Sequence, residues 1–141
     1  MDNMYFVAKS SDSADFYPTN TAASFKIKLY KPLILKGSWE VGLLGFTLTN
    51  VETKEVPDTM LIESNLCQYT TVVGGRKRVP VLRHIFKAGS NMSWEFDSPI
   101  YMPVNQPFVE TIEIYINSGQ GSQLSFESGT STCILHLRQS E

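Results

Sequence analysis

The longest apolar run of the sequence, residues 37–50, reads G-S-W-E-V-G-L-L-G-F-T-L-T-N. Its apolar residues alternate with polar residues or glycine in both halves, as in a β-strand, whose side chains point to opposite faces in turn. The alternation changes phase between Leu43 and Leu44. Either a β-bulge near Gly42 or Gly45 re-aims the strand, or the strand is covered on both faces. Both explanations predict a central strand.

The rest of the chain has the same character. Short alternating segments follow one another at intervals of roughly ten residues, separated by Gly, Pro, Asn, Asp and Ser, and helical periodicity is nearly absent. Besides the run at 37–50, we expect strands at residues 5–9, 24–30, 60–64, 66–73, 79–86, 92–96, 108–117, 123–127 and 132–138. This rhythm predicts an all-β sandwich or jelly roll of about eight to nine antiparallel strands, with the strand order left open.

The length of 141 residues suits a single domain, residues 1–141, with short flexible ends at 1–3 and 139–141. Charged residues make up only 18% of the chain, compared with about 25% in an average protein. The net charge of −2 predicts no general attraction to nucleic acid or to an acidic membrane. We expect no signal peptide and no membrane span, because no apolar run approaches the ~20 residues that a membrane helix needs.

The two cysteines, Cys67 and Cys133, lie in apolar strand-like segments and match no metal-binding or redox spacing. A disulfide between them is one alternative. Two buried thiols fit the pattern better, and they indicate synthesis in the reducing cytoplasm or nucleus of a cell.

Candidate catalytic groups are few. His84 and His136 alternate with apolar neighbours, so each is most simply an outward residue of a strand. Glu110 and Glu113 are three residues apart on an expected strand and therefore point to opposite faces, which prevents them from acting as a carboxylate pair. Glu40 is expected to point outward or to form a salt bridge. We therefore expect no enzymatic activity, no metal and no cofactor.

A basic segment, Arg76, Lys77 and Arg78, follows the two glycines at 74–75. It lacks the helix that completes a phosphate-binding loop. A solvated hairpin tip is the simplest interpretation, and a contact with an acidic partner or packaged nucleic acid is the alternative.

Several motifs occur in an order that resembles one known family. They are the segments FKIKL (25–29), LILKGSWEVGL (33–43), IESNL (62–66), VGG (73–75), VPVLR (79–83), IEIYIN (112–117), Gly121, Phe126 and LHLR (135–138). Together they lie within residues 17–138, almost the whole chain. In order and spacing they resemble the small penton-like minor capsid proteins of Polinton/Maverick elements and the related adintoviruses.

The resemblance implies a single jelly roll that assembles as a homopentamer in the virion of a double-stranded DNA virus or virus-like element. Such pentamers fill the fivefold vertices of an icosahedral shell built mainly from a double jelly-roll major capsid protein. A closed ring needs two different, complementary flanks, and permanent interfaces are commonly large and apolar. We expect the subunit interface among Trp39, Leu44, Phe46, Tyr69, Tyr101 and Tyr115, with Tyr30 and Phe126 as further candidates, whichever of these face away from the core.

In such a ring, the phase change in residues 37–50 has a specific meaning. The half containing Trp39, Val41 and Leu43 is expected to face one layer. The half containing Leu44, Phe46 and Leu48 is expected to face another, with one set at a subunit boundary.

Two other classes of function remain. A monomeric β-sandwich that binds a receptor or a carbohydrate would gather aromatic residues at one exposed loop end. A cupin-like enzyme would need two or three histidines and a carboxylate around a metal, and the chain has only His84 and His136. A structural, non-enzymatic subunit is the leading expectation.

Overall fold

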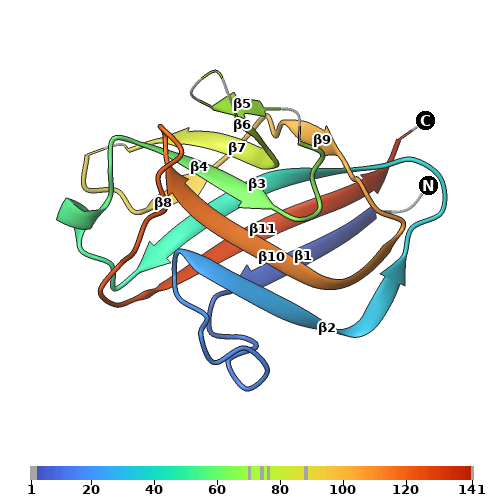
Figure 1. The fold of residues 1–141 in the computed structure, drawn as a ribbon, viewed down its shortest axis with the longest axis horizontal. Helices are drawn as coiled ribbons and strands as arrows, with labels where there is room; N and C mark the ends of the chain where they lie inside the picture. Colours follow the sequence, from blue (N-terminus) through green and yellow to red (C-terminus); the bar gives the residue numbers. More distant parts are fainter. Residues whose placement is uncertain (1–2, 70, 74, 76, 88, 141) are drawn as a thin grey trace.

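The computed structural model describes residues 3–69, 71–73, 75, 77–87 and 89–140 (Figure 1). Arg76, the first residue of the basic segment, lies outside the described residues. The described residues form eleven strands and one short 3-10 helix. Their bounds are β1 (Asn3–Lys9), β2 (Ser24–Ile34), β3 (Trp39–Thr49), η1 (Thr53–Glu55), β4 (Thr59–Ser64), β5 (Thr71–Val73), β6 (Lys77–Val79), β7 (Val81–Phe86), β8 (Ser93–Glu95), β9 (Tyr101–Pro103), β10 (Phe108–Ser118) and β11 (Thr130–Gln139).

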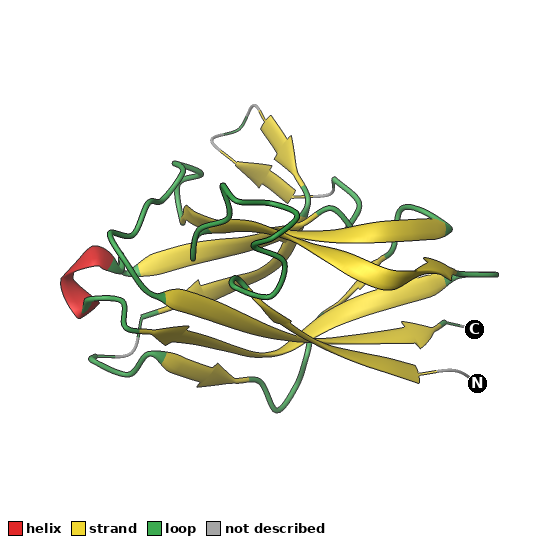
Figure 2. Ribbon diagram, turned by 90° about the horizontal axis from the view of Figure 1, so that it is seen from below, coloured by secondary structure: helices red, strands yellow, loops and turns green. Residues whose placement is uncertain are grey.

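The main strands form two antiparallel sheets, seen as two layers in Figure 2. Sheet A has the order β1-β11-β3-β8, and β9 also pairs with β3. Sheet B has the order β2-β10-β4-β7. The pairing is nested along the chain, because β1 pairs with β11, β2 with β10, β3 with β8 and β9, and β4 with β7. The predicted all-β sandwich is confirmed, and the nested order is compatible with a jelly roll.

The core lies between the two sheets and follows from the alternation of each strand. On β10, Ile112, Ile114 and Ile116 point inward and are almost completely buried. Leu135 and Leu137 are the corresponding inward residues of β11 in sheet A. These side chains belong to one continuous hydrophobic cluster, so the two sheets share one main core.

A β-bulge at Leu44 explains the phase change in the central strand β3. Ile134 and Leu135 are adjacent on β11, but they pair with Gly45 and Leu43, which leaves Leu44 as the extra residue. Leu43 and Phe46 consequently point to the same side, and both are buried in the core. Of the two explanations, the bulge is therefore right. The expectation that the two halves of the run face different layers is wrong.

The hairpin of β5 and β6 lies outside sheet B and projects from that layer in Figure 2. Val79 of β6 packs with Leu61 of β4 and Val81 of β7 in a small cluster separate from the main core. Pro80, which has no backbone N–H to donate, separates β6 from β7, so the expected strand at 79–86 is divided. The expected strand at 66–73 is reduced to residues 71–73.

Other differences concern segments without regular pairing. Residues 123–127 form no strand, and only Gln123 makes an isolated bridge, to Asn117. The apolar side chains of Leu124 and Phe126 pack against or within the core from a loop, which accounts for their strand-like spacing and removes Phe126 from the surface. The short strand β9 was not expected, because three prolines lie close to it in the sequence.

Asn3 and Gln139 are the terminal residues of β1 and β11, which are paired in sheet A (Figure 1). The described residues include no helix that is both long and apolar enough to cross a membrane.

Candidate functional site: the outer faces of the two sheets

Two of the six expected interface residues lie inside the subunit. Trp39 is 8% exposed, and its indole N–H donates to the carbonyl oxygen of Lys36 at 2.9 Å. Phe46 is 1% exposed, and its ring lies 5.4 Å from the ring of Trp94. The bulge at Leu44 turns Phe46 inward, and Trp39 is buried in the same phase as Val41 and Leu43. Neither Trp39 nor Phe46 is therefore available to a neighbouring subunit. This corrects the expected interface.

The other four candidates are divided between the two outer faces. Leu44 is half-buried at the bulge, and its carbonyl accepts the N–H of Phe96 at 3.0 Å. Tyr101 lies on the outer face of sheet A and Tyr115 on that of sheet B, and both are half-buried. Tyr69 is exposed in the segment before β5. The structure therefore places these residues in two separate groups.

A row of rings crosses the outer face of sheet A. Tyr5, His136, Gly42 and Tyr101 are successive cross-strand partners on β1, β11, β3 and β9. The imidazole of His136 stacks on Tyr5, with centroids 4.5 Å apart, and meets the edge of Tyr101 at 5.6 Å. A methyl group at Gly42 would lie 2.9 Å from the Tyr101 ring. The glycine thus makes room for the tyrosine.

Hydrogen bonds fix the protonation of His136. Its Nε2 lies 2.9 Å from Oδ1 of Asn3, which only accepts, so this nitrogen carries the proton. Its Nδ1 lies 2.7 Å from the hydroxyl of Tyr101 and accepts from it. Burial, and to a lesser extent the positive charge of Arg138, lower the pKa of His136 below its usual value. His136 is therefore a neutral residue of the outer face, in agreement with its expected outward position.

Arg138 completes this cluster. Its guanidinium lies 3.5 Å above the Tyr101 ring, and its Nε is 2.6 Å from Oε1 of Glu40. The expected salt-bridge role of Glu40 is confirmed. The cluster is held together by stacking, hydrogen bonds and one ion pair.

An exposed apolar patch adjoins the cluster. Val7 of β1 is 65% exposed and pairs with Ile134 of β11, which is also exposed. Tyr5, two residues before Val7 on the same face, is 64% exposed. We call Tyr5, Val7 and Ile134 the sheet-A patch. No pattern in one strand predicts it, because its members become neighbours only through strand pairing.

A second apolar patch lies on the outer face of sheet B. Ile34 of β2 is 69% exposed and is the direct partner of Phe108 on β10, which is also exposed. We call these two residues the sheet-B patch. Tyr30 on the same strand is 97% exposed, where the register of β2 and β10 shifts and residues 29–32 oppose one residue of β10. Tyr30 is therefore the one additional candidate that the structure places at the surface.

The two described residues of the basic segment are exposed. Lys77 and Arg78 are strand residues of β6, paired with Val73 and Val72 of β5. The expected hairpin therefore exists, but Lys77 and Arg78 lie in its second strand.

A polar group surrounds Tyr115 on the outer face of sheet B. The Tyr115 hydroxyl donates to Oε1 of Glu113 at 2.5 Å. Glu63, the cross-strand partner of Tyr115, accepts a hydrogen bond from the side chain of Asn117. The pKa of Tyr115 is raised, first by burial, then by the hydrogen bond and charge of Glu113, and by Tyr69. Two side-chain hydrogen bonds therefore hold this group on the outer face of sheet B.

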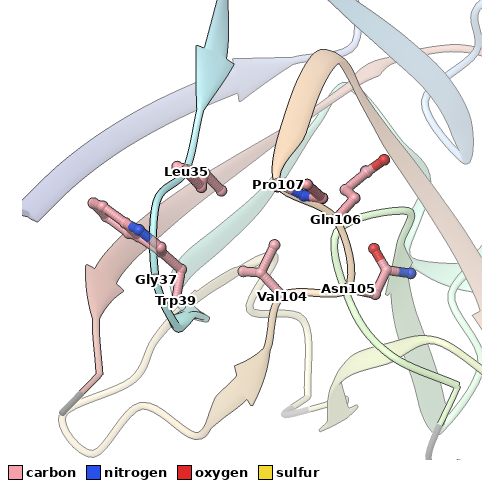
Figure 3. Close-up of a pocket in the computed structure, with 7 residues that line it drawn as sticks. All are labelled: Leu35, Gly37, Trp39, Val104, Asn105, Gln106 and Pro107. Carbon is pink, nitrogen blue, oxygen red and sulfur yellow. The ribbon is translucent and has the colours of Figure 1, made fainter.

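A small hollow with a mixed polar and apolar lining lies at one end of the sandwich (Figure 3). Its volume is about 180 Å³, and Leu35, Trp39 and Val104 line one part of it. The side-chain amide of Asn105 points away from Trp39 in this view and donates to the carbonyl of Cys67 at 3.0 Å. The Asn105 amide therefore has its hydrogen-bond partner within the fold.

Glu110 and Glu113 line one common hollow, so the expectation that they point to opposite faces is wrong. The register irregularity between Val109 and Thr111 breaks the alternation of β10 at Glu110.

The two cysteines are buried. Cys67 and Cys133 are free and fully buried, as expected, and burial raises the pKa of each thiol to about 12. Such thiols are poor nucleophiles at neutral pH. Within the described residues, no three His, Cys, Asp or Glu side chains converge as a metal site.

Comparison of the sequence with models of protein families finds no match, and the same holds for comparison with curated proteins.

Proposed function

We propose that this chain is a non-enzymatic structural protein, a penton-type minor capsid subunit that forms a homopentamer at icosahedral vertices. The observation that carries the proposal is the presence of two exposed apolar patches on opposite outer faces of a small nested-strand sandwich. Exposed apolar patches of this kind commonly mark protein interfaces. The number five and the capsid context come from the order of motifs that resembles penton-like proteins.

The two patches suit a ring. A ring closes by heterologous contacts, in which one surface of a subunit meets a different surface of the next. The sheet-A patch contains Tyr5, Val7 and Ile134, and the sheet-B patch contains Ile34 and Phe108. If the sheet-A patch of each subunit meets the sheet-B patch of its neighbour, every subunit uses both faces once.

Further parts of the proposal follow from the same assignment. The protein would act in the virion, without cofactor, after synthesis in the reducing cytoplasm or nucleus. Its larger partner would be a double jelly-roll major capsid protein. Contact with nucleic acid through the basic segment containing Lys77 and Arg78 is a subordinate part of the proposal, supported by their exposure.

The mass in solution tests the ring. Sedimentation or native mass spectrometry should give five times the monomer mass. The double variant Tyr5→Ser/Val7→Ser removes one patch and Ile34→Ser/Phe108→Ser removes the other, so each alone should be monomeric. Val72→Ser, the same change at an exposed valine outside both patches, should leave the mass unchanged.

Mixing the two double variants distinguishes a heterologous contact from a symmetric one. Each variant keeps one intact patch, and the two intact patches are complementary, so the mixture should contain dimers but no ring. A wild-type protein that stays monomeric at high concentration would overturn the proposal.

The aromatic row on sheet A favours a second candidate function. Tyr5 is exposed and held flat by His136, which makes a rigid aromatic platform. A recognition module for a carbohydrate or receptor is therefore the alternative, although the aromatics lie on a sheet face and not at the loop end first expected. A glycan array tests it directly, and binding that Tyr5→Ser abolishes would favour it.

A further inference from the structure

A hollow of about 280 Å³ lies on the outer face of sheet B, apart from both apolar patches. Strands β4 and β10 contribute Glu63, Tyr115 and Asn117, and β6 contributes Lys77. Its other lining residues are Ala23, Gly121 and Gln123. The hollow is therefore built from elements far apart in the sequence.

A buried carboxylate forms part of its wall. Glu63 is only 8% exposed, and among the described residues its one hydrogen bond comes from Nδ2 of Asn117 to Oε2, at 2.5 Å. Within the same residues it forms no ion pair. A carboxylate withdrawn from water is unfavourable unless charges or hydrogen bonds compensate it. Oε1 of Glu63 has no donor from the described part of the chain and is not fully enclosed, so it is open to the hollow.

Charged groups of both signs surround the hollow, and Lys26 is the cross-strand partner of Glu113. Glu113 lies on the same outer face and accepts the hydroxyl of Tyr115 at 2.5 Å. Lys77 lines the hollow but lies beyond ion-pair distance of Glu63. Glu63 is therefore the carboxylate that a cation from outside meets in this hollow, at its second oxygen.

We propose that this hollow binds a primary ammonium group, as carried by a lysine side chain of a partner protein. An ammonium has three N–H donors, and the hollow offers acceptors on Glu63, Asn117 and Gln123. A guanidinium prefers both oxygens of one carboxylate, and Oε2 of Glu63 is already engaged by Asn117. The site therefore favours lysine over arginine.

This inference does not rest on the proposed ring. The sheet-A and sheet-B patches contribute no residue to the hollow. A protein that fails to form a pentamer can still bind the ammonium group, and a pentamer can lack this site, so the two proposals fail separately.

The probe is propylammonium chloride, titrated up to about 100 mM into 15N-labelled protein in the oligomeric state that it adopts. The readout is the side-chain amide signal of Asn117 and the backbone signal of Glu63. Both should shift and saturate. Tetramethylammonium chloride has the same charge but no N–H donor, and it should produce no saturable shift at these signals. Equal shifts from both salts would overturn the proposal.

Glu63→Gln keeps the shape and the acceptor for Asn117 but removes the charge. Binding should weaken by about tenfold or more, because a charge-assisted hydrogen bond is lost. Glu95→Gln, an equivalent change at an exposed position of β8, should bind as the wild type does. Binding by Glu63→Gln equal to that of the wild type would overturn the proposal.

Lys77→Met tests whether the hollow is filled from within the chain. Removing a nearby positive charge should tighten binding of the external ammonium. If the wild type shows no binding and only Lys77→Met binds, then Lys77 itself is the occupant and the proposal is wrong.

A second titration identifies the source of the ammonium group. Nα-acetyl-lysine amide carries the same head group with peptide bonds attached. Tighter binding of this compound than of propylammonium supports a partner protein, through contacts beyond the head group. Tighter binding of propylammonium overturns the assignment to lysine and indicates a free amine.

Discussion

The imidazole of His136 lies flat against the ring of Tyr5, with centroids 4.5 Å apart and ring planes inclined by 4°. At the edge of the imidazole, Nδ1 accepts a hydrogen bond from the hydroxyl of Tyr101. Arg138, paired with Glu40, lies over the Tyr101 ring, and its positive charge acts on His136. This arrangement suits the neutral imidazole, because protonation would remove the acceptor at Nδ1 and place a second cation near Arg138.

The lowered pKa of His136 predicts a loss of stability in mild acid. In the unfolded chain the group takes up a proton near its ordinary pKa of 6.5, whereas in the folded protein it does so only at lower pH. Its contribution to stability is therefore complete above about pH 6.5 and is lost as the pH falls below that value. Urea denaturation at pH 7.5 and pH 5.5 measures it. His136→Gln should flatten the dependence and His84→Gln should not; an unchanged slope in His136→Gln would refute the prediction.

Phe46 and Leu44 should differ strongly when truncated, although they are two residues apart in one apolar run. Phe46→Ala opens a cavity beside Trp94 and should cost about 3–5 kcal/mol of unfolding free energy. Leu44→Ala, at the half-exposed bulge, should cost about 1 kcal/mol. Chemical denaturation of both variants decides this. Equal losses would mean that the bulge does not separate the two side chains.

Both thiols should be protected by the fold. Because burial raises the pKa of Cys67 and Cys133 to about 12, neither ionises at pH 8 in the folded state. We expect no reaction with iodoacetamide in native buffer and two alkylations in guanidinium chloride, counted by mass spectrometry. If either cysteine reacted in native buffer as fast as it does in guanidinium chloride, the result would contradict the structure.

Gly129 and Gly75 form a matched pair for a fourth prediction. Both have positive φ, 104° at Gly129 and 71° at Gly75, so a Gly→Ala change strains the backbone at each, and more at Gly129, which lies farther from the left-handed region. A methyl group at Gly129 would lie 2.6 Å from the carbonyl oxygen of Thr49, whereas at Gly75 no atom of the described residues lies within 4 Å. Gly129→Ala should therefore be the less stable variant by about 2 kcal/mol, measured by thermal or chemical unfolding. Similar stabilities would show that this turn adjusts freely.

Alternation in the sequence identified most of the core. The isoleucines of residues 112–117 alternate with polar residues, and they are the buried side chains of β10. The same pattern was misleading at Phe126, whose side chain fills the core from a loop. Apolar residues at every second position indicate that one side of a segment is buried. In residues 123–127 a loop buries Leu124 and Phe126 against the core without pairing to a strand.

The candidate surfaces were only partly foreseen. Tyr101 and Tyr115 were expected at a surface and lie on outer faces, but Trp39 and Phe46 were expected there and are buried. Nothing in the sequence indicated that Tyr5 meets His136, or that Ile34 meets Phe108. Each of these contacts depends on the register between strands that are far apart in the chain.

The sequence by itself determined an all-β chain, a central strand at residues 37–50 and two buried thiols, because alternation and turn residues are local properties. Only the tertiary structure decided which explanation of the phase change was right. The pairing of Ile134 with Gly45 and of Leu135 with Leu43 leaves Leu44 as the bulge, and this one extra residue turns Phe46 into the core. A bulge is defined by two strands together, so one strand's sequence could pose the alternatives without choosing between them.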